Sequence, residues 1–193
     1  MANTITQTRL SFDDYLAMPE MQRRYDILDG EMIMSPAPTG EHNWVVLSLA
    51  LILRVFAQKH RPGVVVVAPW DVLIQRDPLR TRQPDVLFVS TERSGFRMRE
   101  DLRDISCLEV PPELVVEVVS RSNTRSRIEA KLQDYCVIGV SECWLAYAKQ
   151  RSVEVLGLSR DGTYGRSRFG PGETLRSRVF PELQVAVDEV FAS

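Results

Sequence analysis

The 193-residue sequence contains few cysteines, three in all, and no Cys-x-x-Cys pair. An odd number without paired spacing argues against a disulfide scaffold and is typical of free thiols in a reducing compartment. Long apolar runs are also missing. The longest, from Trp44 to Phe56, is interrupted by Arg54, whereas a membrane-spanning helix needs about 20 apolar residues. The first ten residues lack the apolar core of a signal peptide. These absences predict a soluble cytoplasmic protein that crosses no membrane.

Neither sign of charge is in excess, because 24 Lys and Arg oppose 26 Asp and Glu and give a formal net charge of −2. Generic nucleic-acid-binding proteins usually carry a basic excess, so any DNA-binding face must be local. The 44% apolar content excludes intrinsic disorder. The chain is long enough to bury the core of a single domain over residues 1–193.

Motifs of several enzyme classes are absent as well. The sequence has no Gly-x-Ser-x-Gly, no phosphate-binding glycine loop and no His-Glu-x-x-His. A Cys–His nucleophile would need Cys136 or Cys143, and both lie in apolar patterns typical of buried thiols.

Turn signals and hydrophobic periodicity predict a mixed α/β (α+β) domain with one central sheet. The expected helices are a short one that begins at Ser11, one over 41–60 with an apolar stripe of Val45, Leu49, Ile52 and Phe56, and one over 123–138. The expected strands are 25–28 and 31–34 around the Asp29-Gly30 turn, 64–68, 72–74, 86–89, 114–119, 143–147, 152–156 and 173–179. Residues 91–110 are expected to form a surface loop or short helix.

One charged residue interrupts the most apolar strand. Glu117 lies within Leu114–Val119, a run typical of a central strand buried on both faces. An unpaired buried carboxylate costs several kcal/mol, so it becomes neutral or finds a partner. A structural explanation is a pair with an arginine, or an exposed strand end. The functional explanation is a ligand or base on a rigid strand.

Two other residues become candidate site residues when they are considered together with Glu117. Asp85 follows Pro84 and precedes the strand expected at 86–89, where a strand-entry aspartate is also ordinary. Two carboxylates at the ends of neighbouring strands can hold one Mg²⁺, which takes one or two carboxylates and several waters. Lys131 lies on the next helix, with Arg127 one turn earlier on the same face. The structural explanation for Lys131 is an ordinary solvated helix face.

Pro84-Asp85, Glu117 and a downstream lysine resemble the PD-(D/E)XK nuclease signature, although the usual lysine position is Val119 here. The chain is similar to the Uma-two branch of that superfamily, restriction-endonuclease-like proteins of bacteria, over residues 25–156. The matching segments are Tyr25–Glu31, Ser35-Pro36, His42, Pro84–Val89, Pro111–Ser120, Lys131, Tyr135, Gly139-Val140 and Trp144. In this branch the lysine has moved to the helix, as Lys131 has.

The resemblance implies a restriction-endonuclease-like central mixed sheet flanked by helices. It also implies hydrolysis of DNA phosphodiester bonds with Mg²⁺, for which Mn²⁺ can substitute, by a homodimer. Asp85 and Glu117 would hold the metal and Lys131 would help to place the nucleophile. Asp26 would complete the site in place of a longer glutamate. The candidate supporting residues are His42, for which capping or packing is the alternative, and Arg127.

Several positions depart from this family pattern. Arg127 and Tyr147 occupy positions where the family often has aspartate, and Arg121 replaces a proline. A second hypothesis is therefore a catalytically weakened or inactive nuclease fold that binds nucleic acid or protein. Basic residues cluster at 93–103, where acidic neighbours predict a solvated surface, and at Arg121, Arg125, Arg127 and Lys131, where the neighbouring Glu117 predicts phosphate contacts.

Overall fold

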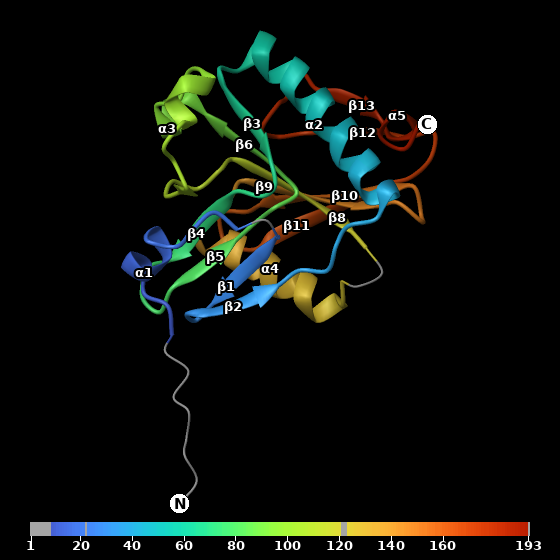
Figure 1. The fold of residues 1–193 in the computed structure, drawn as a ribbon. Coiled ribbons are helices and arrows are strands. Elements are labelled where there is room, and N and C mark those ends of the chain that lie inside the picture. Colours follow the sequence, from blue (N-terminus) through green and yellow to red (C-terminus); the bar gives the residue numbers. More distant parts are fainter. Residues whose placement is uncertain (1–8, 22, 121–122, 193) are drawn as a thin grey trace, which may run out of the picture.

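The computed structural model describes residues 9–21, 23–120 and 123–192, and it has the mixed α/β architecture expected from the sequence (Figure 1). The helices are α1 (Phe12–Leu16), α2 (Gly40–His60), α3 (Thr91–Ser94), the 3-10 helix η1 (Arg99–Leu102), α4 (Arg125–Val137) and α5 (Val187–Val190). The two long helices, α2 and α4, cover opposite faces of the largest sheet (Figure 1).

The largest sheet has six strands in the order β11-β10-β9-β8-β6-β3. These strands are β3 (Gly63–Val67), β6 (Val86–Ser90), β8 (Leu114–Val119), β9 (Glu142–Tyr147), β10 (Ser152–Leu158) and β11 (Tyr164–Phe169). Strand β8 is parallel to β9 and antiparallel to β6, so this central sheet is mixed. The valines of β8 suit an interior strand, because apolar layers cover both of its faces.

A second sheet, of five strands in the order β2-β1-β5-β4-β7, corrects the expectation of one sheet. Its strands are β1 (Tyr25–Leu28), β2 (Glu31–Met34), β4 (Asp71–Gln75), β5 (Arg80–Arg82) and β7 (Cys107–Leu108). The predicted hairpin at Asp29-Gly30 is confirmed, and it joins this sheet through the pairing of Ile27 with Thr81. Pairing between such distant segments leaves no periodic signal in the sequence.

The C-terminal part also differs from the expectation. The strand expected at 173–179 is only β12 (Thr174–Arg176), and it pairs with β13 (Gln184–Ala186) in a separate two-stranded sheet. The sequence did not predict β5, β7, β11, β13 or α5. These elements are short or carry exposed polar residues, so hydrophobic periodicity does not mark them.

Helix α2 begins where the Thr39 side chain accepts a hydrogen bond of 3.2 Å from the His42 backbone N–H. Its buried residues are Val45, Leu49, Leu53 and Ala57. The expected stripe was therefore right in its first half, while Ile52 and Phe56 are only partly buried. By length and composition alone α2 could also cross a membrane. In the structure its buried stripe packs against the central sheet, while 22% of its most apolar 18-residue stretch is buried.

Helix α4 packs Leu132 and Tyr135 on the opposite face of the same sheet. Its N-cap is Thr124, whose side chain accepts a hydrogen bond from the Arg127 backbone N–H. This packing brings Lys131, one residue before the buried Leu132, to the face of β8 that carries Glu117.

Candidate active site

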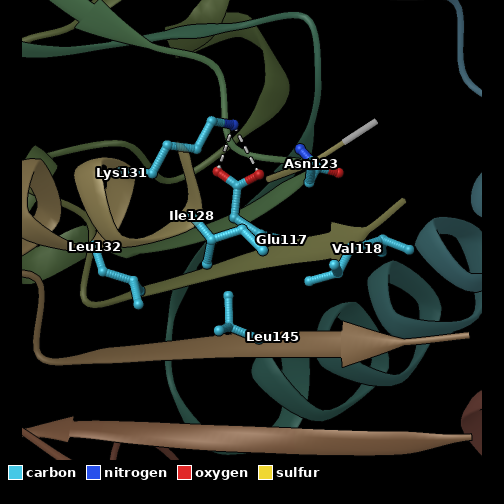
Figure 2. Close-up of a pocket in the computed structure, with 8 residues that line it drawn as sticks. Glu117, Val118, Asn123, Ile128, Lys131, Leu132 and Leu145 are labelled. Carbon is cyan, nitrogen blue, oxygen red and sulfur yellow. Dashed lines mark hydrogen bonds and ion pairs between the residues drawn. The ribbon is translucent and has the colours of Figure 1, made fainter. Parts of the chain in front are cut away.

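Glu117 is buried in the middle of β8, with 9% of its surface exposed. Lys131 Nζ donates to both carboxylate oxygens of Glu117, at 2.9 and 2.8 Å, as Figure 2 shows. The Tyr135 hydroxyl donates to Oε1 of the same carboxylate at 2.6 Å. The partner that the buried acid requires is thus a lysine on α4, and not an arginine.

Asp85 lies directly before β6 and is 2% exposed. In the β6–β8 ladder Val86 faces Val116, so one step further along Asp85 comes opposite Glu117. Residues opposite each other on antiparallel strands project to the same face and lie about 5 Å apart at Cα. The carboxylate of Asp85 also accepts a hydrogen bond of 2.6 Å from the Val118 backbone N–H. The two acids are therefore neighbours, as the sequence predicted.

Two basic side chains contact Asp85. Arg24, which precedes β1, donates to Oδ1 of Asp85 and, at 2.6 Å, to the Gln83 carbonyl oxygen. His42 Nε2 lies 3.3 Å from Oδ2 of Asp85. His42 thus reaches the site from the first turn of α2, and its backbone also takes part in the helix cap. Nothing in the sequence marks Arg24 as a site residue beyond its position beside the hairpin.

The two acids have pKa values displaced in opposite directions. Burial disfavours the charged form of Asp85, but the hydrogen bond from His42 and the charge of Arg24 outweigh it and hold the pKa at about 2. Burial raises the pKa of Glu117, and the charge of Asp85 reinforces this rise while Lys131 opposes it. Neighbouring carboxyl groups with pKa values pushed apart are typical of functional sites.

Lys131 remains a cation in this setting. Burial lowers its pKa, but the charges of Glu117, Asp26 and Asp85 outweigh that effect and raise the pKa above the ordinary lysine value. His42 is affected in the same way: burial is the largest single effect and lowers its pKa, but the hydrogen bond to Asp85 and the charge of Asp85 together raise the pKa above the ordinary histidine value. The site therefore combines two acids with the cations Arg24 and Lys131 and with a histidine whose pKa is raised.

Asp26 lies at the edge of this group. Its Oδ2 accepts a hydrogen bond of 2.9 Å from Arg82, and its Oδ1 accepts one of 3.2 Å from the Gln83 backbone N–H. Arg82 also binds Asp134 of α4 at 2.7 Å. Asp26 thus acts on Lys131 through its charge, and its own hydrogen bonds go to Arg82 and Gln83.

The remaining predicted residues lie outside the acid pair. Arg127 is exposed on α4, and within the described ranges it is not an ion-pair partner of either acid. Arg121 lies outside the residues that the structure describes. In the first basic cluster, Arg99 lies 3.8 Å from Glu100 on the exposed surface, as expected, whereas Arg93 lies 3.6 Å from the buried carboxylate of Glu113.

A groove adjoins the site at the C-terminal ends of β8 and β9. Its volume is about 460 Å³, and it lies beside a much smaller cavity of about 10 Å³ that Glu117 and Lys131 line (Figure 2). The groove is lined by Val119, Ser120, Asn123, Arg125, Ile128, Glu129, Tyr147, Lys149, Gln150, Glu154 and Arg166. Arg166 binds Glu129 at 2.8 Å, so Arg125 and Lys149 are the cations available to an anionic ligand.

The donor set fits a hard divalent cation. A carboxylate has about four lone-pair positions. On Asp85, three of these positions are used, by Arg24, His42 and the Val118 amide. On Glu117, three are used by Lys131 and Tyr135. Each acid keeps one position, which suits an ion held by two carboxylates and completed by water. Within residues 9–21, 23–120 and 123–192 no group of three or more His, Cys, Asp or Glu is placed to hold a metal.

Comparisons with known proteins agree with this architecture. A family model, Uma2, described as "Putative restriction endonuclease", matches residues 12–188. The fold is similar to a crystal structure described as a putative nuclease belonging to DUF820 from Anabaena variabilis. The TM-score is 0.77 at 16% sequence identity, over 95% of this chain and 98% of that chain. At this identity the likeness concerns the fold. No curated protein sequence gives a significant match.

Proposed function

Because the chain belongs to the Uma2 restriction-endonuclease family, we propose that it hydrolyses phosphodiester bonds of DNA in a Mg²⁺-dependent reaction. The observation that carries the proposal is the pair formed by Glu117 on β8 and Asp85 at the start of the neighbouring β6, with Lys131 bound to Glu117. Carboxylates on rigid strands hold a fixed geometry, which this chemistry requires.

In this proposal Asp85 and Glu117 hold the cation, and Mn²⁺ can replace Mg²⁺ because it takes the same oxygen ligands. When bound, such an ion lowers the pKa of water and offsets charge on the phosphate. Arg24 and His42 keep Asp85 ionised, so that this acid is a ligand at neutral pH. Glu117 is held in place by Lys131 and Tyr135.

Hydrolysis adds water to phosphorus and breaks a P–O bond, which leaves an alcohol and a phosphate monoester. Lys131 contributes as a cation, because the neighbouring charges of Glu117, Asp26 and Asp85 raise its pKa above the ordinary lysine value. Its ammonium group stabilises the negative charge that develops on the phosphate and keeps Glu117 oriented. Asp26 strengthens this positive charge from a distance, through its effect on the pKa of Lys131.

The groove beside the acid pair is the proposed path of the DNA strand. Arg125 and Lys149 supply phosphate contacts, which dominate affinity for DNA. Tyr147 also lines the groove, and the guanidinium carbon of Arg168 lies over its ring, 5.4 Å from the ring centre. This arrangement is compatible with a net charge of −2, because the positive groups are local.

The first experiment is a calorimetric titration of Mn²⁺ and Mg²⁺ into the wild type and into Asp85→Ala. We expect about one ion per chain in the wild type and none in the variant. Cleavage of supercoiled plasmid DNA with Mg²⁺ follows, and Asp85→Asn, Glu117→Gln and Lys131→Met are each expected to lose about 100-fold or more of the activity. Asp104→Asn is the control, because Asp104 is an exposed carboxylate outside the site. Full cleavage by Asp85→Asn would exclude the proposal.

A second candidate function is supported by the ion pairs of the same acids. Arg24, His42 and Lys131 neutralise Asp85 and Glu117 from within the chain, which is compatible with a nuclease fold that binds nucleic acid without cutting it. A duplex that binds through Arg125 and Lys149, with no metal uptake and no cleavage in Mg²⁺ or Mn²⁺, would favour this function.

A further inference from the structure

Helix α2 presents an apolar stripe to solvent on the side opposite its buried face. The stripe consists of Trp44, Leu47, Leu51 and Val55, each of which is 52% exposed. Their spacings of three, four and four residues place them on one face of the helix. Single exposed apolar residues are common, but a contiguous row of large ones marks an interaction surface.

The ends of the stripe carry opposite charges. Glu41 lies in the first turn of α2 and Lys59 in the last turn, and both are exposed. Neither forms an ion pair within the part of the chain that the structure describes. Each sign is also the one that the helix dipole favours at that end.

The stripe is complementary to a reversed copy of itself. Three pairs of residues on α2 are centred on nearly the same point, between residues 49 and 50. These pairs are Glu41 with Lys59, Trp44 with Val55, and Leu47 with Leu51. A two-fold axis there brings Glu41 opposite the Lys59 of a second copy, Trp44 opposite Val55, and Leu47 opposite Leu51. These registers agree within one residue, which is about 1.5 Å along a helix.

We propose that two copies of this chain associate through α2, antiparallel, with the stripe at the centre and two Glu41–Lys59 ion pairs at its ends. An isologous contact of this kind is the commonest way in which homo-oligomers form. The location of the stripe suits such a contact, because α2 lies on the outside of the central sheet (Figure 1). Trp44 is fixed in place by its indole N–H, which donates to the Ala192 carbonyl oxygen at 2.7 Å.

The size of the surface predicts a reversible dimer. A 21-residue helix is about 31 Å long and about 10 Å wide, so the stripe offers roughly 300–400 Å² per copy. Stable interfaces bury about 800 Å² per partner. We therefore expect a dissociation constant in the micromolar range, with monomer and dimer both populated at working concentrations.

Sedimentation equilibrium between about 1 and 200 μM tests the proposal. The wild type is expected to shift from monomer to dimer over this range, and Leu51→Glu is expected to raise the dissociation constant more than tenfold. Val137→Glu is the matched control, because Val137 is a 68% exposed apolar residue on a different helix. Far-UV circular dichroism verifies that all variants fold.

A charge reversal tests the register independently. Glu41→Lys is expected to weaken the dimer by placing two lysines opposite each other, and Glu41→Lys with Lys59→Glu is expected to restore it. A wild type that stays monomeric at 200 μM, or a dimer that Leu51→Glu leaves unchanged, would overturn the proposal. So would a monomer that binds vesicles of anionic phospholipid through the stripe, since the surface would then serve a membrane.

Discussion

The Asp85 carboxylate accepts a hydrogen bond of 2.6 Å from the backbone N–H of Val118, the residue after Glu117. This contact fastens the acid that precedes β6 to the strand that carries the other acid. The position of one carboxylate relative to the other is thus set by the β6–β8 ladder and not by flexible loops. The basic side chains of Arg24, His42 and Lys131 reach this pair from three other parts of the chain.

Replacement of Lys131 by methionine is expected to destabilise the protein by about 2–4 kcal/mol. The change removes the cation from a buried carboxylate, which normally costs about 3–5 kcal/mol. The raised pKa of Glu117 and its hydrogen bond to Tyr135 offset part of that cost, because the acid can take up a proton. Urea unfolding at pH 7 measures the effect.

Lys149→Met is the control for this variant, because Lys149 is exposed and not bound to a buried acid. The loss in Lys131→Met is expected to shrink at pH 5, where protonation of Glu117 is easier. A change of less than about 0.5 kcal/mol at pH 7, the usual size for a surface substitution, would contradict the assignment of a buried ion pair.

The low pKa of Asp85 makes the free energy of unfolding depend on pH in the acidic range. Its pKa of about 2 in the folded protein lies below its ordinary value of 3.8. An acid with a lowered pKa stabilises the folded protein fully when the pH is above its ordinary pKa. This stabilisation is lost as the pH falls through the pKa of the folded state. The contribution is about 2 kcal/mol. Between pH 5 and pH 2, the wild type is therefore expected to lose about that much more stability than Asp85→Asn.

Urea unfolding of both proteins across this pH range checks the difference, since the other carboxyl groups are shared and their effects largely cancel. Asp85→Asn keeps an oxygen that can accept the Val118 N–H, so the fold is preserved in the comparison. Parallel pH profiles for the two proteins would show that Asp85 has an ordinary pKa.

The local elements of this fold were readable from the sequence. The Asp29-Gly30 turn, the valine run of β8 and the periodicity of α4 each have a local cause, and all three lie where the sequence predicts them. The five-stranded sheet was not readable, because it depends on pairings such as Ile27 with Thr81 across the chain. Short strands such as β7 carry too few residues to show a period.

The residues of the candidate site also fall into those that the sequence indicates and those that it does not. A carboxylate inside an apolar strand is unusual in sequence, so Glu117 could be singled out in advance, and the family resemblance marked Lys131, but the ion pair between the two was not predicted. Arg24 could not be singled out, because it is 61 residues from Asp85 and its surroundings resemble any polar loop. Similarly, nothing local indicated that Asp26 would bind Arg82.

Arg24 and a bound metal compete for Asp85 in the proposed mechanism. Arg24 donates to Oδ1, and its removal would leave that oxygen open to a divalent cation. Arg24→Met is therefore expected to bind Mn²⁺ several-fold more tightly than the wild type, whereas Asp85→Ala loses binding. Isothermal calorimetry measures both. The control is Arg99→Met, because the Arg99 side chain is 91% exposed. Weaker Mn²⁺ binding by Arg24→Met would indicate that Arg24 instead orients Asp85 for the metal.

If DNA lies in the groove, the salt dependence of DNA binding should change when the cations of the groove are removed. If Arg125 and Lys149 contact phosphates, each releases counterions on binding, and replacing either by alanine should weaken DNA binding regardless of sequence. The slope of log K against log salt concentration is expected to fall by about 1 in each single variant and by about 2 in the double variant. Fluorescence anisotropy with a labelled duplex, in calcium to prevent cleavage, gives these slopes. Arg160→Ala is the control, since Arg160 is exposed and does not line the groove. If the double variant and Arg160→Ala have equal slopes, DNA does not follow the groove and must approach the acid pair from another side.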